Sequence, residues 1–173
     1  MGKVRCYYTI TYNRRMITEK DKEFMEMAAR LAEENVLHGG GPFGAVIVRD
    51  GKVLATGVNT VTLTKDPTAH AEVNAIRNAC SEGQTFSLKG AVIYSSCEPC
   101  PMCLSAIYWA GLSRLYYGNT QDDADRINFS DKFIYQELEK PKISRSIPAI
   151  HIEDSTAIRA FEMWAEKEDK ILY

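Results

Sequence analysis

Hydrophobic residues recur every three or four positions along the segment that follows Thr18. This spacing places them on one face and predicts an amphipathic helix that ends at about Leu37. Thr18 is placed to cap the first turn, with Asp21 three residues later as its partner in a box-like arrangement. The glycine run at 39–41 and the proline after it then end the helix.

A second pattern, rich in β-branched and apolar residues, begins directly after that proline. Two such runs flank Asp50-Gly51, a dipeptide that is the strongest short-range signal for a β-hairpin. Short apolar runs further along the chain predict three more strands. They lie at 91–95, 114–117 and 147–152. The sequence therefore predicts five strands, of which the first two form an antiparallel hairpin.

Helical periodicity separates the later strands. The predicted helices lie at 70–80, at 101–110, at 121–139 as one or two short polar helices, and at 155–170 with Ser155 as the cap. Strands that alternate with helices after an initial hairpin indicate a sheet that is covered on both faces. We therefore expect the α/β class and a three-layer α/β/α sandwich around a mixed five-stranded sheet.

The length of 173 residues fits a single domain with one core. We expect that domain to span 17–173. It is preceded by an extension at 1–16 that shows no hydrophobic period and that we expect to be loosely ordered. No internal repeat, low-complexity segment or linker divides the rest of the chain.

The formal net charge of -2 does not favour a nucleic-acid partner, since such proteins are usually basic. No apolar run reaches the roughly 20 residues that span a bilayer, and the start of the chain lacks an apolar signal segment. The five cysteines are an odd number and include a Cys-x-x-Cys pair, which suits a metal or redox role in a reducing compartment. We therefore expect a cytoplasmic protein with no membrane partner.

Three residues suited to metal binding lie at the start of two predicted helices: His70, Cys100 and Cys103. Two thiolates and one imidazole form a soft ligand set that suits Zn²⁺. Helix N-termini also favour the thiolate form of cysteine. Three protein ligands leave a fourth position for water, whose pKa zinc lowers toward about 7. The sequence therefore predicts one catalytic zinc ion per subunit.

Glu72 follows His70 by two residues. In a first helical turn its carboxylate lies near the metal without having to bind it. It can then take a proton from water and pass it to a ring nitrogen and afterwards to a departing amine. We expect Glu72 to be the catalytic residue. The pattern His-x-Glu followed by Pro-Cys-x-x-Cys is the signature of the zinc deaminases that act on nucleobases.

Two other interpretations of the cysteines stay open. An isolated Cys-x-x-Cys is also typical of a thioredoxin-like redox pair, although such pairs lack an upstream His-x-Glu. A structural zinc site needs a fourth protein ligand, and Cys97 is the candidate because it forms a second Cys-x-x-Cys with Cys100. That interpretation predicts a non-catalytic module that binds a protein partner, and it leaves Glu72 without a role.

From about Thr18 to Tyr173 the chain resembles the cytidine-deaminase-like superfamily and, within it, the bacterial guanine deaminases. The resemblance rests on GGPFGAVIV (40–48), DPTAHAEVNAIR (66–77), SSCEPCPMCLSAIYWA (95–110) and FIYQELEKP (133–141). The central motifs are shared with the tRNA adenosine deaminases. The Tyr-Trp pair at 108–109, the FIY segment and the final Tyr173 are similar to the guanine branch.

This resemblance implies that the substrate is a small purine base and that guanine is hydrolysed to xanthine and ammonia. It implies a base pocket lined by Phe43 and Trp109, with Ala71 also in contact with substrate. Asn59 would hydrogen-bond the purine edge. Phe43 and Trp109 are equally compatible with plain core positions.

The resemblance also implies that Asp131 accepts hydrogen bonds from the N–H groups of guanine, although a helix N-cap would explain this residue as well. Proteins of this branch are typically homodimers that exchange their C-terminal segments, and the last aromatic residue closes the partner's pocket. Tyr173 matches that residue. The sequence leaves open whether this contact forms within one chain or between two. It also leaves open a tRNA adenosine deaminase, or a deaminase of guanosine, cytosine or another aminated heterocycle.

Overall fold

The computed structural model of the protein describes residues 16–153 and 155–172. The predicted extension at 1–16 lies outside the described residues except for Met16, and Tyr173 lies outside them as well. Within the described ranges, no helix combines the length and apolar character that a bilayer crossing demands.

Helix α1 spans Glu19–Leu37 and confirms the amphipathic pattern. A capping box closes its N-terminus, as predicted. The backbone N–H of Asp21 donates to Thr18 Oγ1 at 3.2 Å, and the backbone N–H of Thr18 donates to a carboxylate oxygen of Asp21 at 2.8 Å. The helix ends before Gly39, whose φ of 84° is the left-handed conformation that glycine favours after a helix.

The sheet has four strands in the described part of the chain. They are β1 (Gly44–Arg49), β2 (Lys52–Val58), β3 (Val92–Cys97) and β4 (Arg114–Asn119). Their order is β2-β1-β3-β4. β1 pairs antiparallel with β2 and β3, while β3 and β4 are parallel, which confirms the mixed sheet. The hairpin turns at Asp50 and Gly51, which both have positive φ, as a type I′ turn requires.

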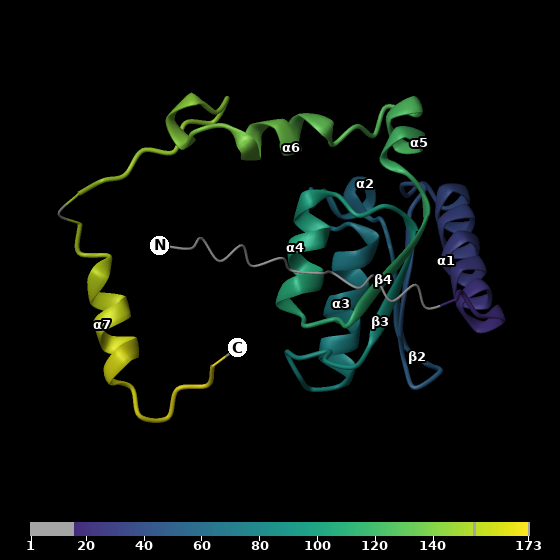
Figure 1. The fold of residues 1–173 in the computed structure, drawn as a ribbon, viewed down its shortest axis with the longest axis horizontal. Coiled ribbons are helices and arrows are strands. Elements are labelled where there is room, and N and C mark those ends of the chain that lie inside the picture. The colour runs from purple at the N-terminus through teal and green to yellow at the C-terminus, as the bar shows by residue number, and fades with distance from the viewer. Residues whose placement is uncertain (1–15, 154, 173) are drawn as a thin grey trace, which may run out of the picture.

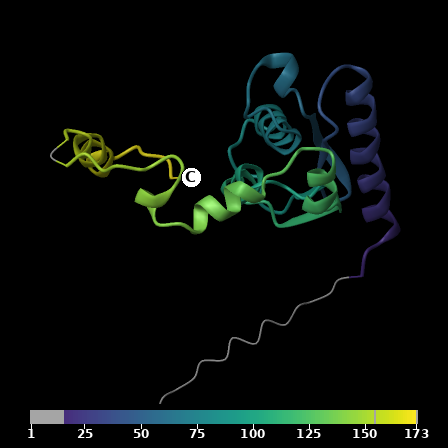
Figure 2. The same cartoon turned by 90° about the horizontal axis from the view of Figure 1, so that it is seen from above.

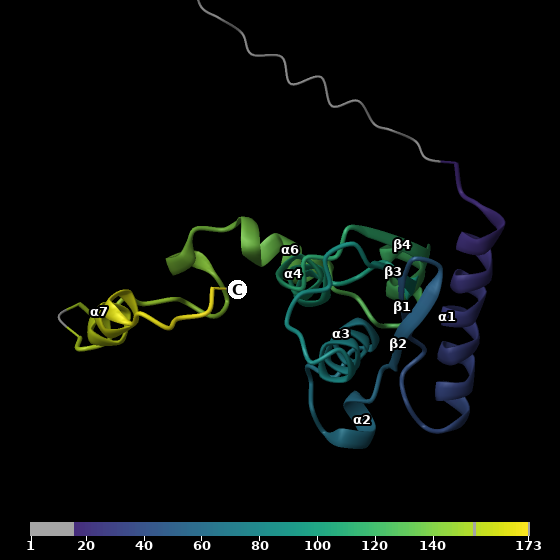
Figure 3. The same cartoon turned by 90° about the horizontal axis from the view of Figure 1, so that it is seen from below.

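Helices cover both faces of this sheet (Figures 1 and 3). α1 lies on one face, and the other face carries α3 (Ala71–Glu82) and α4 (Pro101–Trp109). Successive residues of β1 point to opposite layers. Val46 packs in the cluster that contains Ala28 of α1, whereas Ile47 packs in the cluster that contains Ala75 of α3. The three predicted layers are therefore present.

β2 and α3 approach each other closely at Gly57. A Cβ atom there would lie 2.3 Å from the carbonyl oxygen of Ala71 and 2.3 Å from the backbone nitrogen of Ala75. Only glycine leaves room for the first turns of α3 to rest on the strand. This contact sets the position of the N-terminus of α3 relative to the sheet, and with it the position of residue 70.

The chain after β4 contains short helices and leaves the sandwich. They are α5 (Gln121–Arg126), α6 (Lys132–Glu139), the 3₁₀ helix η1 (Lys142–Ser144) and α7 (Ile158–Glu166). Figures 1 and 2 show that α7 lies well apart from the sheet and from the helices that cover it. A further short helix, α2 (Val61–Thr64), was not predicted.

Two predictions for this last part differ from the structure. Residues 147–152 form no strand, so the described residues contain four strands and not five, and Ile147 is 84% exposed. An alternating apolar run becomes a strand only where a neighbouring strand hydrogen-bonds its backbone N–H and C=O groups. This segment extends away from its own sheet. Helix α7 begins at Ile158, with Ala157 rather than Ser155 at its N-cap.

Candidate metal centre and substrate pocket

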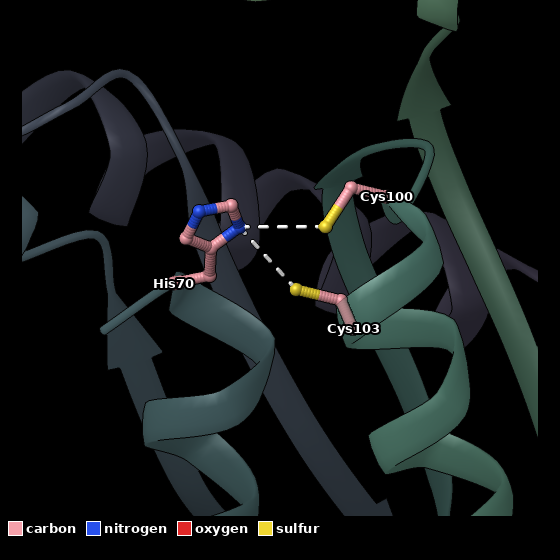
Figure 4. A group of neighbouring side chains, drawn as sticks. All are labelled: His70, Cys100 and Cys103. Carbon is pink, nitrogen blue, oxygen red and sulfur yellow. Dashed lines mark hydrogen bonds between the residues drawn. The ribbon is translucent and has the colours of Figure 1, made fainter. Parts of the chain in front are cut away.

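The three predicted metal ligands lie at two neighbouring helix starts. His70 is the N-cap residue of α3 and Cys100 is that of α4, while Cys103 lies in the first turn of α4. Pro101 occupies the first position of α4, where the missing N–H of proline is not needed. Figure 4 shows the imidazole and the two thiols converging between the helices. Two separate motifs thus meet because α3 and α4 pack on the same face of the sheet.

The spacing of these side chains suits a zinc ion. His70 Nδ1 lies 3.6 Å from Cys100 Sγ and 3.4 Å from Cys103 Sγ. One ligand atom from each residue lies within 4.8 Å of the other two. Tetrahedral zinc with ordinary Zn–N and Zn–S bond lengths places its ligand atoms roughly 3.5–3.8 Å apart. The nitrogen and sulfur donors therefore fit zinc in both chemistry and spacing.

The two thiols differ in acidity. The pKa of Cys100 falls to about 4, chiefly because Cys103 donates a hydrogen bond to it and also because His70 is adjacent. The same hydrogen bond raises the pKa of Cys103, which keeps the shared proton. The hydrogen bond with Cys100 raises the pKa of His70. When a metal ion binds, it replaces the protons that the thiol and imidazole groups share here.

Glu72 lies in the first turn of α3 and is only 6% exposed. Ser95 of β3 donates its hydroxyl to Glu72 Oε1 at 3.1 Å, which orients the carboxylate. Burial raises the pKa of Glu72. A raised pKa makes a carboxyl group a stronger proton acceptor than an ordinary glutamate, which suits proton transfer in catalysis.

A cavity of about 660 Å³ opens beside the metal-binding group. Its wall includes six predicted site residues: Phe43, Asn59, His70, Glu72, Cys100 and Asp131. Phe43 and Phe129 meet edge to face, with ring centroids 5.2 Å apart and an interplanar angle of 82°. This aromatic pair forms a wall against which a planar heterocycle can pack.

Two polar residues of the wall have side chains suited to substrate recognition. Asn59 is buried, and its Oδ1 accepts a hydrogen bond from the N–H of Val61 at 3.2 Å, which orients the amide. Asp131 occupies the N-cap position of α6 but makes no side-chain capping hydrogen bond. Burial raises the pKa of Asp131, and the negative charges of Cys100 and Glu98 raise it further.

Trp109 does not lie in the wall of this cavity. It is the last residue of α4, is 74% exposed, and borders a separate hollow with Phe86 and Tyr108. The six residues from Cys103 to Trp109 carry the chain about 9 Å along the helix axis, away from the metal-binding end. This exposure contradicts the core interpretation of Trp109, whereas its contact with the base stays a prediction.

Two other predicted substrate residues are also not in the wall. Ala71 is completely buried at the first residue of α3, where its carbonyl oxygen packs against Gly57. Tyr173 lies outside the described residues. The third metal ligand, Cys103, is likewise fully buried and does not line the cavity.

Sequence reasoning missed several residues of the site. Ser95 orients Glu72, and Phe129 completes the aromatic wall with Phe43. Glu98 and Gln121 also lie in the wall, where the backbone N–H of Gln121 donates to the carboxylate of Glu98 at 3.3 Å. Ser95 and Glu98 lie inside the segment 95–110 that carries the cysteines, whereas Gln121 and Phe129 lie in no recognisable motif.

Cys97 does not behave as a fourth metal ligand. Its thiol donates to the carbonyl oxygen of Thr120 at 3.6 Å, and burial raises its pKa to about 11. In the part of the chain that the structure describes, the metal-binding group consists of His70, Cys100 and Cys103 alone. Three protein ligands beside a cavity are the arrangement of catalytic zinc rather than structural zinc.

Comparison with known proteins agrees with this site. Residues 18–119 match the family model of the cytidine and deoxycytidylate deaminase zinc-binding region. The guanine deaminase of Bacillus subtilis (strain 168) is 46% identical over 151 residues, which are 87% of this chain and 97% of that protein. The crystal structure of guanine deaminase from Bacillus subtilis superposes with a TM-score of 0.85 and covers 88% of this chain and 98% of that one.

Enzymes that act on tRNA are also similar, but over a shorter part of the chain. The tRNA-specific adenosine deaminase of Agrobacterium fabrum is 39% identical over 113 residues, which are 65% of this chain and 74% of that protein.

The structure of a guanine deaminase from Nitrosomonas europaea superposes with a TM-score of 0.62 at 28% identity, covering 67% of this chain and 66% of that one. The chain therefore belongs to the cytidine and deoxycytidylate deaminase family of zinc-binding enzymes.

Proposed function

We propose that this enzyme hydrolyses guanine to xanthine and ammonia with one zinc ion per subunit. The supporting observation is the similarity to the guanine deaminase of Bacillus subtilis, which extends over 87% of this chain. It therefore continues well beyond residue 119, where the family model ends, and includes the segment around Asp131. Similarity to the tRNA enzyme of Agrobacterium fabrum covers less of the chain, and the net charge of -2 does not favour a tRNA substrate.

His70, Cys100 and Cys103 would hold the zinc ion through Nδ1 and the two Sγ atoms. The ion supplies Lewis acidity, which makes a water molecule acidic enough to act as a nucleophile at neutral pH. The three residues would hold the ion beside the cavity, since His70 and Cys100 both line its wall.

Glu72 carries the protons. Hydrolysis adds the oxygen of one water molecule to the amino-bearing carbon of guanine and breaks the bond from that carbon to nitrogen, which leaves as ammonia. The carboxylate of Glu72 takes one proton from the water and delivers it to the adjacent ring nitrogen. It then transfers the second proton to the leaving amine. Burial raises the pKa of Glu72, which favours this alternation between acceptor and donor.

The base would pack on Phe43 and Phe129, and the amide of Asn59 would bond its polar edge. Asp131 would accept hydrogen bonds from the guanine N–H groups. A carboxylate suits these donors, whereas adenine presents a different set. A buried site of this kind rejects a base that leaves its polar groups unpaired.

Replacement of Asp131 with asparagine is expected to lower kcat/KM for guanine by roughly 10- to 100-fold. The amide keeps the shape of the side chain but removes the charge that strengthens its hydrogen bonds to guanine. Because Asp131 makes no side-chain capping bond, the melting temperature should stay close to that of the wild type. Steady-state kinetics and thermal unfolding test this pair of outcomes, and a lowered melting temperature with unchanged kcat/KM would instead assign Asp131 to helix α6.

Ammonia release across a panel of bases and nucleosides tests the substrate itself. The zinc-loaded enzyme is expected to release ammonia from guanine much faster than from guanosine, adenine or cytosine. Conversion of adenosine to inosine in an anticodon stem-loop, with guanine unchanged, would establish the tRNA alternative. Absence of ammonia from every compound would leave a zinc module without catalytic function.

We further propose that two copies of the enzyme exchange their C-terminal segments. The segment after α6 exposes large apolar side chains that its own sandwich does not cover, including Ile150, Phe161 and Met163. β4 is an edge strand of the sheet, and such an edge readily accepts another strand. Pairing of the partner's residues 147–152 with β4 would complete the predicted five-stranded sheet. It would also bring the C-terminal end of the partner toward the pocket.

Complementation between two inactive variants tests this exchange. One variant carries Glu72→Gln in the full-length chain, and the other lacks residues 141–173 but retains Glu72. In an exchanged dimer, the full-length variant supplies its segment to the pocket of the shortened one, so mixing them is expected to restore activity. If the segment closes the pocket of its own chain, the mixture will be as inactive as its components.

We place this enzyme in the cytoplasm, as a single catalytic domain at 17–173. Cys80, Cys97, Cys100 and Cys103 are all free thiols in the structure. Thiols that have to bind a metal are best preserved in a reducing compartment.

A further inference from the structure

The side-chain amide of Asn35 reaches the cavity wall from α1, which lies on the other face of the sheet from α3 and α4. Asn35 lies in the last turn of α1 and is 6% exposed. Its Nδ2 donates to the carbonyl oxygens of Gly41 and Asn59, each at 2.7 Å. Both of these residues line the cavity, whereas Asn35 does not. The side chain therefore joins two cavity-lining segments from behind.

The glycines before Phe43 make room for this arrangement. A Cβ atom on Gly40 would lie 2.3 Å from Asn35 Nδ2 and 2.5 Å from its Oδ1. A Cβ atom on Gly41 would lie 2.9 Å from Asn59 Cγ. Any side chain at these two positions would therefore displace one of the two amides. The glycine run thus has a packing role in addition to ending α1.

Backbone hydrogen bonds connect Asn35 to the residues that face the substrate. The N–H of Gly41 donates to the carbonyl of Asn59 at 3.2 Å, and the N–H of Asn59 donates to the carbonyl of Phe43 at 3.1 Å. These bonds continue the β1–β2 ladder past the ends of both strands. The Asn35 amide bonds both chain segments at the end of this extended ladder. It therefore sets the distance between the segment of Asn59 and the segment of Phe43.

We infer that Asn35 is a positioning residue for substrate binding. It touches neither the base nor the metal, but it holds Asn59 and Phe43 where they bind the substrate. The inference rests on the proposed function, in which these two residues contact the purine. Glu72 and the metal ligands belong to α3 and α4, which Asn35 does not contact through these bonds. Its loss is therefore expected to weaken substrate binding more than it slows the chemical step.

Asn35→Asp is the sharpest test because it retains the shape of the side chain and removes both N–H donors. An ionised carboxylate would then face two carbonyl oxygens at hydrogen-bond distance. KM for guanine is expected to rise roughly tenfold or more, a typical effect of an unpaired buried polar group. The value of kcat should change by less than about threefold over the same kinetic series, and the zinc content should stay the same.

Asn78→Asp, at an exposed position, is the control for the loss of a side-chain bond to the hairpin. Asn78 of α3 also donates from its Nδ2 to a backbone carbonyl of the hairpin, that of Thr56, at 2.9 Å, but it does not line the cavity. Both substitutions remove a bond from side chain to backbone, so both are expected to lower the melting temperature. Only Asn35→Asp is expected to raise KM.

Gly40→Ala disturbs the same amide without changing Asn35, because the added Cβ would collide with it. This variant keeps the test decisive if Asn35→Asp fails to fold. It is expected to raise KM with little change in kcat. KM is measured for whichever base the wild-type enzyme deaminates fastest, so failure of the guanine assignment does not affect the outcome. An unchanged KM in a folded Asn35→Asp or Gly40→Ala enzyme, or a loss confined to kcat or zinc content, would overturn the inference.

Discussion

Replacement of Glu72 with glutamine is expected to lower kcat for guanine by a factor on the order of 10³, within the range that general acid–base catalysis contributes. Glutamine has the same shape and can still accept the hydrogen bond from Ser95, but it cannot exchange a proton with water or with the ring nitrogen. Zinc content should remain that of the wild type, because Glu72 is not among the three ligands. Xanthine formation and metal analysis of the same samples measure both quantities.

The stability of the Glu72 variant separates a chemical defect from a folding defect. Burial raises the pKa of Glu72, so this group disfavours folding at any pH where the carboxyl group of the unfolded chain is ionised. This unfavourable contribution is absent below the ordinary pKa of a glutamate, grows as the pH rises from there to the raised pKa, and is constant above it. A neutral glutamine avoids it, so the variant should be no less stable than the wild type at pH 7.

Glu98→Gln is the control for this experiment. Glu98 is a second carboxylate in the wall of the same cavity, and it accepts a hydrogen bond from the N–H of Gln121. Its replacement should change kcat far less than replacement of Glu72. Equal losses in the two variants would show that general electrostatics of the cavity, and not proton transfer by Glu72, limit the rate.

The second large effect is expected at the metal centre. Cys103→Ser should release zinc and abolish deamination together, because a serine hydroxyl does not ionise at neutral pH and is a hard donor in a soft site. Zinc affinity should fall by more than about 100-fold. That factor is the upper end of the loss caused by mutating residues that support the ligands without binding the metal themselves. Titration with a competing chelator measures the affinity, and added zinc should not restore activity at concentrations that saturate the wild type.

Cys97→Ser is the matched control for the metal site. Cys97 is also buried and lies near the same turn, but its thiol bonds the carbonyl oxygen of Thr120 rather than joining the ligand group. This variant should keep its zinc and most of its activity. Loss of zinc from Cys97→Ser would revive the interpretation of a structural site with four protein ligands.

Much of the sandwich follows from local patterns. The spacing after Thr18 predicts α1 together with its capping box, and Asp50-Gly51 predicts the hairpin turn that the structure contains. These features could be predicted because each depends on residues only a few positions apart. The segment at 147–152 differs, because its alternating pattern indicates burial without indicating which sheet edge buries it.

The metal centre was also predictable, and for a related reason. His70 and Glu72 lie in one short motif and Cys100 and Cys103 in another, and each motif begins a helix. Within a single helical turn, sequence spacing determines which side chains share a face. The chemistry of the donors then specifies zinc without knowledge of the fold.

The pocket around the metal depends on distant parts of the chain. Phe129 meets Phe43 only because the segment after α5 passes the glycine-rich loop, and Asn35 reaches Asn59 only because α1 packs beside the end of the hairpin. Trp109 lies in an apolar motif next to the cysteines, yet the length of α4 carries it to another hollow. The contacts of Phe129 and Asn35 have no local signal, because each depends on how separate elements pack.

The sequence by itself therefore determined the elements of the sandwich, the ligands of the metal and the residue beside them that can carry protons. These depend on periodicity, spacing and the chemistry of donor atoms, which act over a few residues. The tertiary structure alone decided which side chains line the cavity, that Cys97 does not join the ligands, and that the C-terminal segment does not cover its own sheet. Those outcomes arise from contacts between residues far apart in the chain, where packing geometry, and not local propensity, determines which atoms meet.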